Sequence, residues 1–211
     1  MRTLIFGNGS IHDYDIVKKY LCKDSIIICC DGGMRHALVL DIIPDFIIGD
    51  LDSAKGEDID YFKRKNVEFF EFPSEKDKTD MEIAVQFAIN KGNSEIYLFG
   101  ALGSRIDHSL ANMHILKLCC DNGIKAFIVD EKNVITMTNS KIEINGNKGD
   151  IISLIPFTHS VENVTTNGLY YKLENAVLYA ESSRGISNVM LENKASVDLS
   201  KGILFVIKSQ D

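Results

Sequence analysis

The sequence predicts an α/β protein with an N-terminal doubly wound, mostly parallel sheet domain, followed by a C-terminal all-β domain of sandwich or barrel-like form. Up to about Asp130, short apolar segments alternate with helical patterns, which is typical of a mostly parallel sheet. From about Asn133 the helical pattern disappears, and short strand-like segments follow one another at close spacing. We therefore expect two domains, at residues 1–130 and 131–211.

Several strands expected in the first half are almost wholly apolar, as is usual for strands that are covered on both faces. The expected strands span residues 3–6, 26–30, 46–48, 68–72, 95–99 and 126–129. Helices are expected between them, where apolar residues recur at helical spacing. These helices span residues 13–21, 34–40, 58–65, 80–91 and 107–120. In such a sheet, ligands bind outside the carboxyl ends of the strands.

Turn signals divide the second half into short strand-like segments, and Asn145-Gly146-Asn147 and Thr166-Asn167-Gly168 are examples of such signals. The expected strands span residues 134–138, 151–155, 161–166, 169–173, 176–181, 186–191, 195–199 and 203–208. No proline-rich or low-complexity linker separates the two halves, and the sequence shows no internal repeat.

Composition and charge narrow the class of protein. The formal net charge is -7 and no basic stripe is present, so we expect no nucleic-acid partner. Apolar runs reach only about five residues, far short of the ~20 that span a bilayer, so we expect no membrane association. The five cysteines include no C-x-x-C pair, which predicts free thiols that pack as small buried hydrophobes. Together with the lack of a signal-peptide pattern, this predicts a cytoplasmic protein.

Two carboxylates lie two residues apart directly after the strand expected at 46–48. In a continuing strand Asp50 and Asp52 would point to opposite faces, so a shared site requires a turn, which Gly49 permits. Two such charges at about 4 Å repel by about 4 kcal/mol at an effective dielectric near 20. Magnesium removes that cost and prefers oxygen ligands. The alternative is a solvated acidic turn.

A third acid, Asp80, follows a capping-box pattern in which Thr79 and Glu82 would close the first turn of a helix. At that position the charge of Asp80 would complement the helix dipole. We favour a role in binding metal or phosphate instead, because Asp77 forms a second acid pair nearby.

Glycines and charged residues also follow two other expected strands. Asp31-Gly32-Gly33 follows residues 26–30, and Gly100 and Gly103 follow residues 95–99. Arg105 suits phosphate oxygens, while Asp107 could cap the next helix or contact a ligand, and His108 could contact phosphate or serve a structural hydrogen bond. Neither a P-loop nor a G-x-G-x-x-G pattern is present. These residues indicate magnesium-assisted chemistry on a nucleotide or polyphosphate.

Four blocks of the sequence resemble those of one family, the thiamine pyrophosphokinases. In order, they are GDLDS at 49–53, DKTDME at 77–82, GALGSRIDHSLAN at 100–112, and SRGISN at 183–188, which is similar to the family's substrate-recognition block. The resemblance spans nearly the whole chain. One departure is Ser104, because bacterial members often have glycine at this position. The difference leaves Arg105 and Asp107 in register with the family pattern.

The resemblance implies an enzyme that transfers the pyrophosphoryl group of ATP to the hydroxyl of thiamine, which gives thiamine diphosphate and AMP. It implies a homodimer with its active site at the interface, a nucleotide- and magnesium-binding first domain, and a thiamine-binding second domain. The implied magnesium ligands are Asp50, Asp52 and Asp80, and Arg105 and Asp107 complete the implied catalytic set. The implied ATP-binding residues are Asp31, Gly32, Thr79, Gly100, Gly103, Arg105, Asp107 and His108.

Ser187 and Asn188 are implied to hydrogen-bond the aminopyrimidine of thiamine, although such a pair is also common in turns. The general base is left open between Asp80 and Asp107. Alternative functions are a pyrophosphokinase for another hydroxymethyl heterocycle such as a pterin, a non-catalytic nucleotide sensor, and a magnesium-dependent hydrolase.

Overall fold

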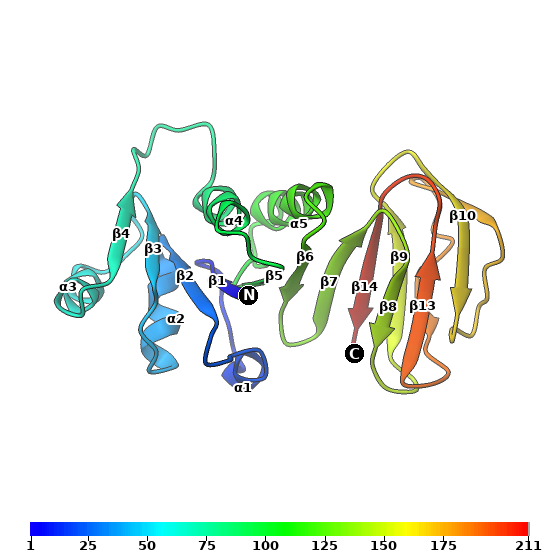
Figure 1. Cartoon of the computed structure of the whole chain (residues 1–211), viewed down its shortest axis with the longest axis horizontal. Coiled ribbons are helices and arrows are strands. Elements are labelled where there is room, and N and C mark those ends of the chain that lie inside the picture. The colour runs from blue at the N-terminus through cyan, green and yellow to red at the C-terminus, as the bar shows by residue number, and fades with distance from the viewer. Residues whose placement is uncertain (211) are drawn as a thin grey trace. The chain divides into compact units, whose positions relative to one another are not determined.

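The computed structural model describes residues 1–210 and divides into two compact units, Met1–Glu131 and Lys132–Asp211. The first unit is a parallel α/β sheet and the second is built from antiparallel strands, so the predicted fold class is confirmed (Figure 1). In the described part of the chain, no helix is long and apolar enough to cross a membrane.

The sheet of the first unit has the strand order β6-β5-β1-β2-β3-β4, and its strands pair in parallel. The strands are β1 (Arg2–Phe6), β2 (Ile26–Cys30), β3 (Phe46–Gly49), β4 (Glu68–Glu71), β5 (Glu95–Phe99) and β6 (Lys125–Val129). The central strands are buried because helices cover both faces, and Leu4, Ile5 and Phe6 are fully buried. The chain reverses its direction across the sheet between β1 and β5, which is where ligands bind in doubly wound folds.

Helices on opposite faces cover this sheet (Figure 1). They are α1 (Tyr14–Lys18), α2 (Met34–Val39), α3 (Gly56–Arg64), α4 (Asp80–Asn90) and α5 (Ile106–Asp121), and a 3-10 turn spans Asp31–Gly33. The α4 helix packs on β1, β2 and β3 and contacts α5. The predicted helix at 13–21 begins one residue later because the Asp13 side chain accepts the Asp15 N–H as its N-cap.

Two antiparallel sheets form the second unit, in the orders β12-β9-β14-β7 and β11-β10-β13-β8. Their strands are β7 (Asn133–Thr138), β8 (Ile142–Asn145), β9 (Ile151–Pro156), β10 (Ser160–Asn167), β11 (Ala176–Tyr179), β12 (Asn188–Val189), β13 (Lys194–Asp198) and β14 (Leu204–Ser209). Side chains from both sheets share one core, which includes Leu154 and Val206 from one sheet and Val164 and Val197 from the other. The unit is therefore a β-sandwich.

Two predicted strands of this unit, at 169–173 and 186–191, are largely irregular. In the first, Leu169 makes only an isolated bridge with Met190, and in the second only Asn188–Val189 pairs as a strand. The cause is local backbone geometry, because Gly168 (φ 74°) and Ser187 (φ 56°) adopt left-handed conformations that interrupt an extended chain. The sequence reading also missed β8, whose short, half-buried pattern gives a weak signal.

The expectation of buried thiols holds for only some of the cysteines. Cys29, Cys30 and Cys119 are buried, and burial raises the pKa of the Cys119 thiol to about 12. Cys22 is exposed because it lies in the turn after α1, where its N–H donates to the Ser25 hydroxyl.

Candidate active site

A cavity of about 640 Å³ opens at the carboxyl ends of the first unit's strands. The loops that follow β1, β2, β3, β4 and β5 contribute to its wall. Among the lining residues are Asp31, Asp50, Asp52, Thr79, Asp80, Gly100, Gly103, Arg105 and His108. Loops of different strands thus bring most of the predicted first-domain site residues into one space.

Three carboxylates gather in this cavity, because one oxygen from each of Asp31, Asp50 and Asp52 lies within 4.8 Å of the others. The backbone turns sharply after β3, where Gly49 has a φ of 153° and Leu51 a φ of 63°. These two positions remove the strand alternation that would otherwise separate the acids. A side chain at Gly49 would place its Cβ 3.1 Å from the Asp31 Cβ, so the close approach of the two loops requires glycine.

The electrostatics of this acid group suit a hard divalent cation. The Asp52 N–H donates to Asp50 Oδ1 at 3.2 Å and holds the pKa of Asp50 below its ordinary value. The charge of Asp50, with smaller effects that include Asp31, raises the pKa of Asp52. Asp31 is only 7% exposed, and its buried Oδ1 has no hydrogen-bond partner. An unpartnered buried carboxylate oxygen beside two further acids fits magnesium.

Asp80 lines the same cavity but is paired with a lysine. It begins α4 after Thr79, whose hydroxyl accepts the Glu82 N–H at 3.2 Å, as the capping pattern predicted. Lys76 Nζ lies 2.8 Å from Asp80 Oδ1 and 3.9 Å from Asp50 Oδ2. In this structure the compact acid group therefore contains Asp31 rather than Asp80, and magnesium ligation by Asp80 stays a prediction.

Two glycine-containing loops contact each other through their backbones beside the acids. Gly9 N–H donates to Gly100 O at 2.8 Å, and Gly100 has a φ of 58°. A Cβ at Gly100 would lie 2.7 Å from Gly7 O. Behind the second loop, the buried Asn112 donates from Nδ2 to Ala101 O at 2.6 Å, which ties this loop to α5.

Arg105 and Asp107 form an exposed ion pair at the start of α5. Arg105 Nη2 donates to Asp107 Oδ2 at 2.6 Å. This bond, with help from the His108 backbone N–H, lowers the pKa of Asp107 to about 2. Asp107 is not among the cavity-lining residues, whereas Arg105 and His108 are.

The remaining predicted residues take other positions. Gly32 is buried beneath Asn8, whose Oδ1 lies 2.6 Å from the place a Gly32 Cβ would occupy. In the second unit, Ser187 is exposed, and its N–H donates to Ser153 Oγ at 3.0 Å. Asn188 is buried and bonded to the Tyr171 backbone. Their contacts with thiamine stay predictions.

A hydrogen-bond network beside the acids was not predicted from the sequence. Ser53 Oγ donates to Asp31 Oδ2 and accepts from Asn8 Nδ2, the latter at 2.8 Å. Arg35 Nη2 in turn donates to Asn8 O at 2.6 Å and to Gly9 O at 3.0 Å. The signal for this network was the run GNGS at 7–10 directly after the first strand, which has the same glycine-rich character as the loop at 100–103.

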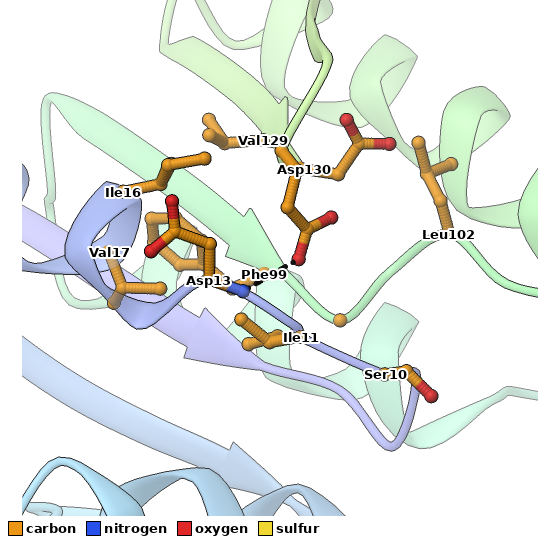
Figure 2. A pocket seen from close by; sticks show the side chains of 11 residues that line it. Ser10, Ile11, Asp13, Ile16, Val17, Phe99, Leu102, Val129 and Asp130 are labelled. Atoms are coloured by element: carbon orange, nitrogen blue, oxygen red, sulfur yellow. Dashed lines mark hydrogen bonds between the residues drawn. The ribbon is translucent and has the colours of Figure 1, made fainter.

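A second, much smaller cavity lies behind the same loops (Figure 2). Its volume of about 10 Å³ is about the space of one water molecule, which is too small for a substrate. At its edge, Glu131 Oε1 accepts the backbone N–H groups of His12 at 2.5 Å and Asp13 at 3.2 Å. This carboxylate therefore anchors the chain that leads into α1.

A doubly wound sheet that carries an acid group after β2 and β3, with glycine loops and an arginine beside the switch point between β1 and β5, defines a phosphate-transferring, nucleotide-dependent enzyme. Residues 17–128 match the family model "Thiamin pyrophosphokinase, catalytic domain", and residues 139–204 match "Thiamin pyrophosphokinase, vitamin B1 binding domain". The chain belongs to the thiamine pyrophosphokinase family.

Individual relatives agree with this assignment. The chain is 31% identical over 195 residues to the thiamine pyrophosphokinase of Bacillus subtilis, and the match covers 91% of each chain. A crystal structure of the Bacillus subtilis enzyme superposes with a TM-score of 0.92 at 28% identity, covering 100% of both chains. The Geobacillus thermodenitrificans enzyme gives a TM-score of 0.88 at 31% identity, covering 100% of this chain and 98% of that one.

The family resemblance that the sequence blocks indicated is therefore confirmed, and so is the predicted enzyme class, an ATP-dependent diphosphokinase. These comparisons favour neither the pterin alternative nor a non-catalytic sensor.

Proposed function

We propose that this chain transfers the pyrophosphoryl group of ATP to the hydroxyl of thiamine, with release of AMP, in a magnesium-dependent reaction. The observation that carries the proposal is the group of Asp31, Asp50 and Asp52 in a cavity at the switch point of a sheet that belongs to this family. The nucleotide and the metal would bind in the first domain, and thiamine would contact the second.

The metal would be held by Asp31, Asp50 and Asp52, with Asp80 as a further candidate ligand. When bound, magnesium would supply charge compensation for the phosphate oxygens of ATP. The chain's own residues orient the substrate around it. Arg105 lines the cavity as a cation with fixed donor geometry, and His108 adds a further donor at the start of α5.

In pyrophosphoryl transfer, most of the catalysis comes from positioning and electrostatic stabilisation. Glycines of the loops at 7–10 and 100–103 line the cavity, and a Cβ at Gly103 would meet nothing within 4 Å, so a phosphate could approach the backbone there without side-chain obstruction. The ion pair with Arg105 lowers the pKa of Asp107 to about 2, and Asp107 is not among the residues that line the cavity. Because Asp80 does line the cavity, we favour Asp80 as the acceptor of the thiamine proton.

The thiamine side of the proposal rests on the second unit. Tyr170 and Tyr171 are 65% and 63% exposed, and Tyr170 N–H donates to Val189 O, so they lie beside the strand that Asn188 begins. Exposed aromatic rings suit a cationic heterocycle. We propose that this face, with Ser187 and Asn188, contacts thiamine and a second subunit in a cytoplasmic homodimer.

A product assay tests the function directly. Purified protein would be incubated with ATP, magnesium and thiamine, and AMP and thiamine diphosphate would be quantified beside a control without thiamine. Equal amounts of AMP and thiamine diphosphate are expected. ADP with thiamine monophosphate would instead show a simple kinase. ATP breakdown without thiamine would show a hydrolase, and lack of product despite ATP binding would reopen the pterin and sensor alternatives.

A further inference from the structure

Lys76 is a cation held among acids in the cavity. Its side chain is only 16% exposed, and Nζ lies 2.8 Å from Asp80 Oδ1 and 3.9 Å from Asp50 Oδ2. It lies in the connection between β4 and α4, where its own N–H donates to Ser74 O at 3.1 Å. The ammonium therefore offsets negative charge on one side of the acid group.

This position conflicts with metal binding at the same carboxylates. An ammonium between Asp50 and Asp80 would repel a divalent cation that uses either residue, and the repulsion is strong in a partly buried site. A lysine side chain has a long flexible stem and can turn away without movement of its backbone. The cavity provides the space for this movement, and lysine ammonium groups bind phosphate as point charges.

We propose that Lys76 is a tethered counter-cation that occupies the acid site in the free protein and moves to the nucleotide phosphates when metal and ATP bind. Metal alone must displace the ammonium without giving it a new partner, whereas ATP supplies phosphate oxygens that receive it. Lys76 thereby makes metal and nucleotide binding cooperative, and by linkage each ligand strengthens the other. The inference rests on the proposed metal-dependent function and adds an order to its binding steps.

Calorimetric titration with Mn²⁺ alone tests the first half of the proposal. In Lys76→Met, which keeps most of the length of the unbranched side chain and removes its charge, the Mn²⁺ affinity of the nucleotide-free protein should rise about tenfold or more. Lys78→Met is the matched control. Lys78 lies on the same loop and also lines the cavity, but its Nζ donates to Gln86 Oε1 at 2.8 Å and lies 3.9 Å from Glu82 Oε1, not beside the acid group. Its removal should change Mn²⁺ affinity by no more than about twofold.

Titration with a non-hydrolysable ATP analogue at saturating Mn²⁺ tests the second half. Lys76→Met should weaken analogue binding about tenfold, because the lysine ammonium no longer binds the phosphates. The same substitution should therefore strengthen the binding of Mn²⁺ alone and weaken the binding of the nucleotide. Thermal unfolding without ligand verifies that each variant folds, and Lys76→Gln is measured beside Lys76→Met as a second uncharged variant.

Two outcomes would overturn the inference: unchanged or weaker Mn²⁺ binding in both uncharged variants, or analogue binding equal to that of the wild type. The proposed function fails separately. If the wild type binds no Mn²⁺ even with the ATP analogue, the metal site itself is wrong. If the wild type binds both ligands and turns over thiamine while the variants behave like it, only the role of Lys76 is wrong.

Discussion

The side chain of Asn188 forms two hydrogen bonds with the backbone of one residue, Tyr171. Its Nδ2 donates to Tyr171 O at 2.7 Å, and its Oδ1 accepts the Tyr171 N–H at 2.8 Å. Oδ1 also accepts the Val189 N–H at 2.9 Å. Asn188 is only 3% exposed. Its bonds attach the irregular segment around Tyr171 to β12, where no strand pairing holds Tyr171 in place.

Asn188→Ala should therefore destabilise the protein as well as weaken thiamine binding. Loss of the amide leaves partly buried backbone groups of Tyr171 unpaired, which costs about 1–3 kcal/mol. Urea unfolding measures this change, and calorimetry measures thiamine affinity at a temperature where the variant is folded. Asn193→Ala, at an exposed position in the next turn, should change stability by no more than about 0.5 kcal/mol. Unchanged stability with lost thiamine affinity would show that Asn188 acts through the ligand alone.

The limits of sequence prediction are clear at this segment. The first unit was predicted well because its strands are covered on both faces and appear as plain apolar runs, such as β2 and β5. In the second unit, the run at 186–191 looked like a strand because apolar residues predominate. A left-handed Ser187 and the Asn188 bonds to Tyr171 interrupt it, and both depend on contacts remote in sequence.

The site shows the same division. Asp50 and Asp52 were predicted to share a site because their spacing and Gly49 are local features. Lys76 gave no such signal, and Ser53 appeared only as the last residue of the GDLDS block, because their contacts with the acids arise only when separate loops meet in the fold. The sequence also grouped Asp80 with the two acids, and Asp80 lines the same cavity, but only the fold shows that Asp31 joins Asp50 and Asp52 from the neighbouring strand.

His36 gives a prediction about pH. Its Nε2 lies 2.9 Å from Gly9 O, which can only accept, so Nε2 carries the proton and Nδ1 accepts from the Tyr14 hydroxyl at 2.7 Å. Burial, followed by the charge of Arg35, lowers the pKa of His36 to about 4. The unfolded chain, with an ordinary histidine pKa near 6.5, binds more protons between these values.

The contribution of His36 to stability is therefore complete above about pH 6.5 and is lost as the pH falls towards 4, by up to about 3 kcal/mol. Urea unfolding of the wild type and His36→Gln at several pH values measures it, and the variant should lose much of this slope. His12→Gln, at an exposed histidine, should keep the wild-type slope. A His36→Gln profile parallel to that of the wild type would contradict a neutral buried imidazole.

Asp52→Asn should remove most turnover. The substitution keeps the size of the side chain and removes one carboxylate from the group formed with Asp31 and Asp50. We expect a loss of about a hundredfold or more in turnover together with weaker Mn²⁺ binding, since loss of even an outer partner of a metal costs 10- to 100-fold. Initial-rate measurements and Mn²⁺ titration check both effects. Asp60→Asn, exposed on α3, is the charge-matched control, and turnover in Asp52→Asn equal to that control would reject the ligand role.

Ser53→Ala tests whether the network beside the acids positions them. The substitution removes the hydroxyl that donates to Asp31 Oδ2 and leaves Asn8 Nδ2 without its acceptor. Because Asp31 would lose its orienting donor, Mn²⁺ affinity in the presence of an ATP analogue should fall about tenfold, with a parallel loss of turnover. Ser53→Thr retains the hydroxyl and should restore most of both. A purely structural role would lower the unfolding free energy without change in Mn²⁺ affinity, and that result would separate Ser53 from the metal site.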